Sequence, residues 1–404
     1  MQGPLSGIRI LELTTTVAGP TVGMILGGQG ADIIKIEPPG IGDLGRFMGD
    51  MRGGMSSMFA TLNRNKRSLV LDLKQTSEMA VFRELAKTAD VVLENYRPGV
   101  VEKLGIDYAT LSDDNPRLVY CSISGYGSSG PYRHRRVYDP LIQATVGASA
   151  EQGGERAQNI RSVVFDKVCG YTAAQSITAA LLQRERTGRG GHLDISMLGA
   201  ALYFQWPDVM WSHTYQGEGV VSGGPLADWF NVFSAADGDI AIVLMVSDGL
   251  FQLCCEALGL ELHLDERFAS FASRLANRPE LQRLLDTALS SWTVAELVET
   301  LDRLEVPVAP VNTLDAVFDD PQVVEQGMIL DAEHPTSGAM KLARNPCSFN
   351  DSEATAGQPA PVLGEHSEEI LTDLGVDRDE IQRMQSREAR NRAALADFHL
   401  HNAR

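Results

Sequence analysis

The sequence has few of the features that mark secreted, membrane or metal-binding proteins. Its 404 residues include only five cysteines and no Cys-x-x-Cys pair, so neither a disulfide framework nor a zinc site is indicated. No run of 18 apolar residues occurs, and no basic segment followed by an apolar stretch stands at the N-terminus. We therefore expect a cytoplasmic protein with no membrane contact and no metal.

Positive charge is also scarce. Lys and Arg number 35 against 53 Asp and Glu, giving a net charge of −18. This excludes a general affinity for nucleic acid, which depends on a positive surface. The excess of acidic residues is unevenly distributed along the chain. Residues 1–150 hold 16 basic and 15 acidic side chains. The acidic excess therefore lies in residues 151–404.

Basic residues gather between residues 64 and 136, and two of them, Lys74 and Arg97, directly follow strand-like segments. Doubly wound folds bind ligands at the carboxyl ends of their strands. These cations therefore predict an anionic, nucleotide-like ligand, with an ordinary solvated surface as the alternative for any single one.

The first half of the chain alternates between strand-like and helix-like patterns. Residues 77–89 show helical spacing of apolar side chains. Strands separated by such helices predict right-handed βαβ crossovers and a mostly parallel sheet, hence an α/β, Rossmann-like doubly wound domain. Near residue 225 the pattern of strand-like and helix-like segments changes to one typical of a smaller α+β domain. The strand-like segments are residues 8–13, 32–37, 68–73, 90–94 and 117–123.

The most helix-like segment is residues 166–186. Asp166 stands where an N-cap is expected, and Thr187-Gly188 where the helix should end. The capping role alone explains an aspartate here. A carboxylate at the positive end of a helix is also held ionised and oriented, as a carboxylate nucleophile requires. Both interpretations are compatible.

The sequence lacks the motifs of three common enzyme classes. The glycines near residues 19–30 do not fit G-x-G-x-x-G and no Walker lysine follows, which disfavours nicotinamide dehydrogenases and P-loop NTPases. Ser122-Ile123-Ser124-Gly125 is not the G-x-S-x-G elbow of a serine hydrolase.

Nine segments, in order from residue 4 to about residue 371, resemble the class III coenzyme A transferases of the formyl-CoA and carnitine-CoA transferase type. They are PLSGIRILEL with AGP, GADIIKIEPPGIGD, NRNKRSLVLDLK, ADVVLENYRPGVVEKLGID, NPRLVYCSISGYGSSGP, YDPLIQA, TGRGGHLDISML, DDPQVVEQGM and LGEHSEEIL.

The resemblance implies a fold of two interlocked subunits. Each would have a large Rossmann-like CoA-binding domain from residues 1–222, a small domain from residues 223–328, and a return to the large domain in residues 329–404. The implied assembly is a homodimer.

The resemblance also implies roles for particular residues. Asp166 in VVFDKVCG matches the family's catalytic aspartate. Gly223 and Gly224 match, loosely, a glycine loop that covers the site. CoA and acyl-CoA are expected as substrates, with no tightly bound cofactor. The residues that match CoA-contacting positions are Val17, Ala18, Leu71, Asp72, Leu73, Lys74, Asn95, Tyr96, Arg97, Lys103, Arg136, Val137, Tyr138 and Met197.

The implied reaction moves CoA from an acyl-CoA donor to a small carboxylic acid, through an aspartyl mixed anhydride and an aspartyl-CoA thioester. Backbone N–H groups at the helix start and in the glycine loop are expected to stabilise the oxyanions. Val17 and Pro38 replace a glutamine and a cationic residue of formyl-CoA members, which argues against formate or oxalate as the acid.

Two alternatives stay open. An α-methylacyl-CoA racemase of the same fold would use a His just before an Asp, but Tyr138-Asp139 stands there, with His134 four residues upstream. Tyrosine is a poor base near neutral pH. The second alternative is a non-catalytic CoA-binding protein.

Overall fold

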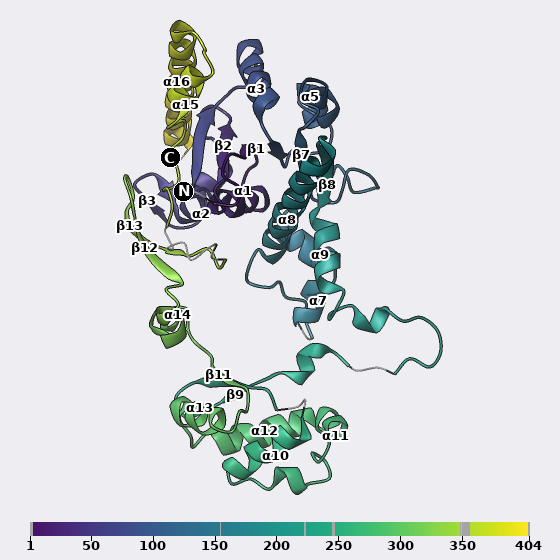
Figure 1. Ribbon diagram of the computed structural model, residues 1–404. Helices are drawn as coiled ribbons and strands as arrows, with labels where there is room; N and C mark the ends of the chain where they lie inside the picture. Colours follow the sequence, from purple (N-terminus) through teal and green to yellow (C-terminus); the bar gives the residue numbers. More distant parts are fainter. Residues whose placement is uncertain are drawn as a thin grey trace. The chain divides into compact units, whose positions relative to one another are not determined.

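The computed structural model describes residues 3–153, 155–221, 224–244, 247–347, 349 and 356–402. The chain divides into two compact units, Met1–Phe204 with Gly327–Arg404 and Gln205–Gln326. The first unit therefore contains both ends of the chain, marked N and C in Figure 1. The sequence-based limits after residues 222 and 328 stay a prediction.

Six parallel strands form the sheet of the first unit, in the order β5-β2-β1-β6-β7-β8. Counted along the chain, this is the order 3-2-1-4-5-6 of Rossmann-type sheets. The predicted α/β fold with a parallel sheet is confirmed. The strands are β1 (Arg9–Leu13), β2 (Asp32–Glu37), β5 (Lys66–Val70), β6 (Val91–Glu94), β7 (Val119–Ser124) and β8 (Gly191–Ser196).

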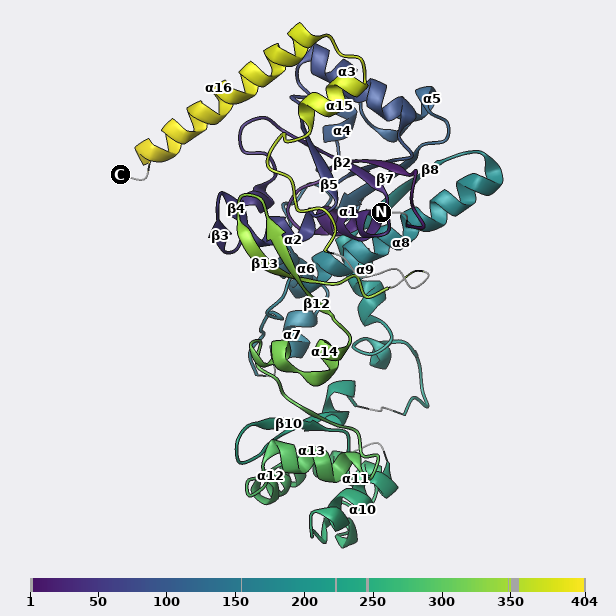
Figure 2. The same ribbon diagram turned by 60° about the vertical axis from the view of Figure 1, so that its left-hand side comes forward.

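Helices cover both faces of this sheet, as Figure 2 shows with α3 and α5 above it and α1 and α8 below it. Successive strand residues point to opposite faces. Ile10 and Val91 therefore pack toward α8, and their neighbours Leu11 and Val92 pack toward α3. The helices of the α8 side are α1 (Ala18–Gly28), α6 (Asp139–Thr145), α7 (Ala148–Gly153), α8 (Val164–Thr187) and α9 (Met197–Gln205); those of the α3 side are α3 (Thr76–Thr88), α4 (Val100–Leu104), α5 (Tyr108–Asp114), α15 (Ser367–Asp373) and α16 (Arg378–Asn402).

The C-terminal part of the chain is fastened along the β5 edge of the sheet. The N–H of His366 donates to the carbonyl of Ser68 at 3.1 Å, and the N–H of Gly364 donates to the Ser68 hydroxyl at 2.9 Å. Met340 packs against a small separate core that contains Phe59 and Ala360. The remaining elements of this unit are the 3-10 helix η1 (Leu44–Phe47), β3 (Met51–Arg52), β4 (Met55–Ser56), α2 (Ser57–Leu62), β12 (Ile329–His334) and β13 (Gly338–Ala343).

The second unit combines a small antiparallel sheet with helices around a core of its own. The strands β9 (Asn231–Ser234), β10 (Asp239–Ile242) and β11 (Val308–Pro310) pair in the order β11-β10-β9. Phe233 and Ile240 of this sheet pack with helix residues such as Leu285. The α-helices are α10 (Asp248–Ala257), α11 (Phe271–Ala276), α12 (Arg278–Leu289), α13 (Val294–Asp302) and α14 (Pro321–Glu325), and the 3-10 helices are η2 (Trp211–His213), η3 (Leu226–Trp229), η4 (Leu262–Leu264) and η5 (Ala316–Asp319).

Helix α8 begins two residues earlier than the sequence predicts. Val163 is its N-cap and provides no side-chain hydrogen bond, so Asp166 is the third helical residue. The expectation that Asp166 caps the helix is wrong, because a carboxylate from another element takes that role. Asp139, the first residue of α6, accepts the N–H of Phe165 at 2.6 Å and that of Asp166 at 3.0 Å. The C-terminal end is as predicted, with Gly188 in the left-handed conformation at φ 72°.

Helices α1 and α8 cross at a glycine. A Cβ atom on Gly170 of α8 would lie 2.8 Å from the carbonyl oxygen of Ala18 and 2.7 Å from the Cβ of Thr21. Such separations are too short for ordinary carbon contacts, so only glycine allows this approach. The first turn of α1 therefore packs directly against α8 at Gly170. This glycine lies four residues after Asp166.

Gly170→Ala should therefore destabilise the fold by about 1–3 kcal/mol, because the added methyl group overpacks the crossing. Urea-induced unfolding measures the effect. Gly191→Ala is the matched control, since a Cβ at Gly191 meets nothing within 4 Å. Equal stability of the two variants would contradict this account of the crossing.

Candidate active site

The strand order reverses between β1 and β6, and the loops after these two strands meet. The side-chain amide of Asn95, just after β6, accepts the N–H of Thr15 at 3.0 Å and donates to the Thr15 carbonyl at 3.0 Å. Ligands of doubly wound folds bind in the crevice at this reversal point. The structure thus brings the turn that carries Val17 and Ala18 together with the segment that begins at Asn95.

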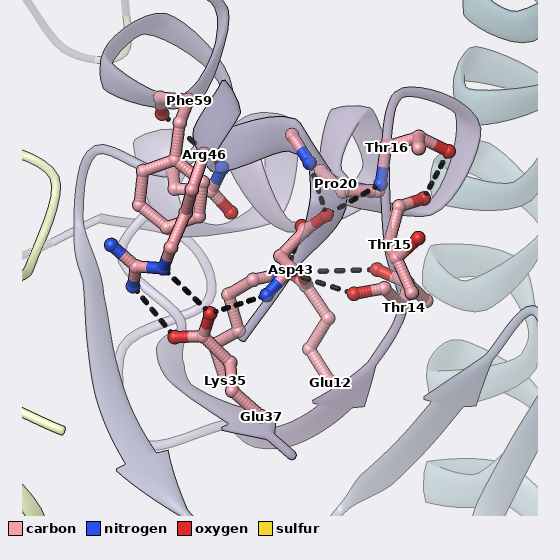
Figure 3. A network of polar contacts seen from close by, with 12 residues as sticks. Glu12, Thr14, Thr15, Thr16, Pro20, Lys35, Glu37, Asp43, Arg46 and Phe59 are labelled. Carbon is pink, nitrogen blue, oxygen red and sulfur yellow. Dashed lines mark hydrogen bonds and ion pairs between the residues drawn. The ribbon is translucent and has the colours of Figure 1, made fainter. Parts of the chain in front are cut away.

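A buried ionic network lies beneath the turn between β1 and α1 (Figure 3). Lys35 Nζ lies 3.0 Å from Glu12 Oε1 and 2.9 Å from Asp43 Oδ2, and Lys66 Nζ lies 2.8 Å from Glu12 Oε2. All four side chains are almost completely buried. Asp43 Oδ1 also accepts the N–H of Thr16 at 2.8 Å. The network therefore reaches the backbone of the turn itself.

The charges of this network stabilise one another. Burial acts to lower the pKa of Lys35, but Glu12, Asp43 and Glu37 raise it above its ordinary value. Burial acts to raise the pKa of Asp43, but Lys35 and the N–H of Thr16 lower it. Burial lowers the pKa of Lys66 to about 8, since Glu12 offsets only part of its effect. Lys35 and Asp43 are thus both charged at neutral pH.

An open hollow of about 450 Å³ lies beside the carboxyl end of β5, and several cationic side chains line it. Of the predicted residues, Leu73, Lys74 and Lys103 line it, and so does Arg83 of α3, which sequence reasoning missed. Arg83 lies seven residues after Thr76, hence on the same face of the helix, and that spacing is a signal that could have identified it. Three exposed cations around one hollow form a site suited to phosphate groups.

The loop that leads into this hollow is fixed by a side chain. Asp72 Oδ1 accepts the N–H of Lys74 at 3.1 Å, and Asp72 Oδ2 accepts from the Gln75 amide at 3.1 Å. Leu71 before it is buried. In contrast, Lys66 of the same basic stretch belongs to the buried network, so part of the predicted basic cluster does not face a ligand.

Glu94 at the end of β6 is a further buried carboxylate that sequence reasoning missed. Its Oε2 accepts the N–H of Tyr96 at 2.8 Å, which fixes the predicted segment from Asn95 to Arg97. Burial raises the pKa of Glu94 to about 7. Tyr96 is partly buried and Arg97 is exposed.

Asp166 lies half-buried in the first turn of α8, next to the buried carboxylate of Asp139. Burial and, to a smaller extent, the charge of Asp139 raise the pKa of Asp166 to about 7, although Lys167 acts to lower it. The expectation that the helix start holds Asp166 fully ionised is therefore wrong. Near neutral pH this carboxyl group is divided between its two forms.

The first N–H groups of α8 are all engaged by the protein. Asp139 takes those of Phe165 and Asp166, the N–H of Val164 donates to the Ser162 carbonyl at 2.8 Å, and that of Lys167 to the Val163 carbonyl at 3.4 Å. The expected oxyanion-binding role of N–H groups at this helix start is therefore not supported.

The other predicted residues divide by location. Val137 packs its side chain against Gly125, where a Cβ would lie 2.0 Å from Val137 Cγ1, and Tyr138 is 65% exposed. Arg136 is exposed, and Met197 is buried at the start of α9. Gly224 belongs to the second unit, where its carbonyl accepts from the Trp211 indole at 3.0 Å. Gly223 lies outside the described residues.

The described residues contain no group of three or more His, Cys, Asp or Glu side chains arranged to hold a metal ion. They also contain no helix long and apolar enough to span a membrane.

Known proteins resemble this chain over nearly its whole length. The model of CoA-transferase family III matches residues 5–367. A succinate--glutarate CoA-transferase of Agrobacterium fabrum is 33% identical over 92% of this chain and 96% of its own. An acetyl-CoA:oxalate CoA-transferase of Acetobacter aceti is 35% identical over 90% of this chain and 94% of its own. The crystal structure of a CAIB/BAIF family protein from Brucella suis superposes with a TM-score of 0.81 at 33% identity, covering 93% of this chain and 100% of its own. The resemblance seen in the sequence is confirmed.

The pH dependence of acyl transfer tests the environment of Asp166. The resemblance implies that Asp166 is a nucleophile, which would work only when deprotonated, so activity should then fall as the pH drops through about 7. Asp139→Asn removes the neighbouring negative charge but keeps an oxygen that accepts the N–H groups of α8. It should lower the pKa of Asp166 and move the acidic limb of the kcat/KM profile to lower pH.

Asp113→Asn, at an exposed position at the end of α5, is the control and should leave the limb where it is. If the acidic limb of the kcat/KM profile stays in place in Asp139→Asn, or moves to higher pH, the charge of Asp139 does not raise the pKa of Asp166.

Proposed function

The chain belongs to CoA-transferase family III, and we propose that it transfers CoA from an acyl-CoA to a carboxylic acid through covalent intermediates on Asp166. The observation that carries the mechanism is the placement of Asp166. This half-buried carboxyl group lies in the first turn of a long helix, has a pKa of about 7, and is held through its backbone N–H by Asp139.

The proposed CoA site runs along the carboxyl edge of the sheet. Lys74, Arg83 and Lys103 supply positive charge for the phosphate groups in the hollow beside β5. Asn95 and its neighbours follow along the crevice, and the turn at Thr15, which Asn95 holds, forms its β1 side. Val17 and Ala18 follow in this turn and are only 4% exposed, so the turn would meet CoA through its backbone. CoA acts as a substrate here, bound and released in each cycle.

The first half-reaction converts the donor thioester into an enzyme-bound thioester. A carboxylate oxygen of Asp166 attacks the acyl carbonyl, the C–S bond breaks, and CoA leaves as its thiolate, giving an aspartyl mixed anhydride. The thiolate then attacks the aspartyl carbonyl, the anhydride C–O bond breaks, and the donor acid departs as a carboxylate. The product is an aspartyl-CoA thioester.

The second half-reaction repeats these steps in reverse order with the acceptor. Its carboxylate attacks the aspartyl-CoA carbonyl and expels the thiolate, which then attacks the acceptor carbonyl of the new anhydride. Asp166 returns as a carboxylate and the acceptor leaves as its CoA thioester. Every intermediate stays activated, so no ATP is required. The raised pKa makes Asp166 a stronger nucleophile than an ordinary aspartate.

Asp166→Asn should abolish acyl transfer, because the amide is not a nucleophile, while CoA binding and thermal stability stay close to wild type. Hydroxylamine added to wild-type enzyme with acyl-CoA should convert Asp166 to a hydroxamate, detected by mass spectrometry of the peptide. Retained transfer activity in Asp166→Asn would contradict the mechanism. So would deuterium incorporation at the α-carbon in heavy water without any acceptor acid, which indicates racemase chemistry.

The proposed assembly is a homodimer. Helices α8 and α9 expose large apolar side chains, including Tyr171, Leu182, Tyr203 and Phe204, each more than half exposed. A monomeric protein rarely leaves such groups uncovered on neighbouring helices. A second copy of the chain would cover them, in keeping with the interlocked dimer that the family resemblance implies.

The proposed acids are dicarboxylates. By their names, the two relatives described above act on succinate, glutarate and oxalate, each of which carries a second carboxylate. Lys167 follows Asp166 directly and is exposed, with Nζ donating to the Ser162 hydroxyl at 2.7 Å. Among the described residues no ion pair within 4 Å involves this ammonium group, although its charge lowers the pKa of the neighbouring Asp166. Lys167 is thus placed to pair with the second carboxylate of an acid that reacts at Asp166.

Lys167→Gln should lower kcat/KM for succinate and glutarate about tenfold relative to butyrate, since a charge-assisted hydrogen bond is lost. The ratio between acids is the readout, because the substitution also changes the pKa of Asp166 and so affects every acid alike. Lys87→Gln on α3 serves as the control. An unchanged ratio would contradict the role of Lys167, and oxalate in the same panel tests the expectation drawn from Val17.

A further inference from the structure

The turn between β1 and α1 contains a strained residue. Thr16 has φ 67°, in the left-handed region that β-branched residues rarely adopt. It stands between Thr15, which Asn95 holds from the β6 side, and Val17, the N-cap of α1. Strained backbone at such a place persists only where its surroundings impose it, and it often marks a functional site.

Asp43 and Lys35 impose this conformation. Asp43 Oδ1 accepts the N–H of Thr16 and the N–H of Gly45, both at 2.8 Å. Lys35 Nζ pairs with Asp43 Oδ2 at 2.9 Å and donates to the carbonyl of Thr14 at 2.8 Å. The two buried side chains thus fix the backbone on both sides of Thr15, as Figure 3 shows.

Asp43 is itself held rigidly. Its backbone N–H donates to Glu37 Oε2 at 3.0 Å, and Glu37 pairs with Arg46 at 2.7 Å. A buried carboxylate with this many partners cannot rotate away from Thr16 without losing its ion pair with Lys35. Such burial of charge adds little to stability but can select one backbone conformation.

We propose that Asp43 is a positioning residue for CoA binding: by holding Thr16 at positive φ, it places Val17 and Ala18 at the crevice where CoA lies. The inference rests on the proposed function, since it assumes that this turn contacts CoA. Asp43 is 1% exposed and is therefore out of reach of a substrate in the crevice. Its effect should therefore appear in the affinity for acyl-CoA and not in the chemical step.

The test compares wild type, Asp43→Asn, Thr16→Gly and the double variant, with KM for acyl-CoA and kcat measured for each. Asp43→Asn turns an amide toward Lys35 and should raise KM about tenfold, with kcat within about threefold of wild type. Thr16→Gly alone should leave KM within about threefold, because glycine adopts positive φ without strain. In the double variant, KM should return most of the way to the wild-type value.

Ser68→Ala is the matched control. Ser68 is buried in the same network and donates to Glu37 Oε1 at 2.7 Å, but it makes no contact with the turn. It should lower the melting temperature without changing KM. If Asp43→Asn does not fold, Asp43→Glu replaces it. That variant keeps the charge opposite Lys35 but displaces the carboxylate from the N–H of Thr16, and the same rise in KM is expected.

The inference is overturned if KM is unchanged in the Asp43 variant, if Thr16→Gly brings no recovery, or if Ser68→Ala raises KM equally. Wild-type enzyme without transfer activity would instead overturn the proposed function. In that event the Kd of CoA, measured by calorimetry on the same variants, tests the role of Asp43 without turnover.

Discussion

The contact between Asp139 and the start of α8 fixes the position of Asp166, and the charge of Asp139 adds to the effect of burial on its pKa. One buried carboxylate accepts two N–H groups at the positive end of a 24-residue helix, an arrangement that stabilises a fold by about 1–2 kcal/mol. Burial raises the pKa of Asp166, and the same negative charge raises it as well. Asp166 is therefore held in place by a neighbour that also contributes to its raised pKa.

Buried and exposed charges serve different purposes in this protein. The network of Glu12, Lys35 and Asp43 is paired and inaccessible, and it shapes the turn at the crevice. The cations of the hollow, such as Lys74 and Lys103, face solvent and are free to meet a phosphate-bearing ligand. The nearly neutral first 150 residues thus contain two charge systems, one that builds the site and one that faces its ligand.

Local patterns in the sequence predicted five of the six strands of the sheet and their parallel arrangement, but not β8. Lys74 and Arg97 could be placed because parallel strands end at a common edge. The true start of α8 could not, since its cap comes from Asp139, 27 residues earlier, and only tertiary structure brings the two together. For the same reason the pKa of Asp166 and the contact of Asp43 with Thr16 escaped prediction. Arg83 could have been predicted, because its helical spacing from Thr76 places both residues on the face of α3 that lines the hollow.

The most direct test of covalent transfer through Asp166 is to follow oxygen. Enzyme is incubated with acyl-CoA and an acceptor acid whose carboxylate carries ¹⁸O, and the peptide that contains Asp166 is then weighed by mass spectrometry. Each turnover through the two anhydrides leaves one acceptor oxygen on the Asp166 carboxylate, so the peptide should gain label as product forms. An unlabelled peptide after many turnovers would show that CoA moves without a covalent bond between Asp166 and the acceptor.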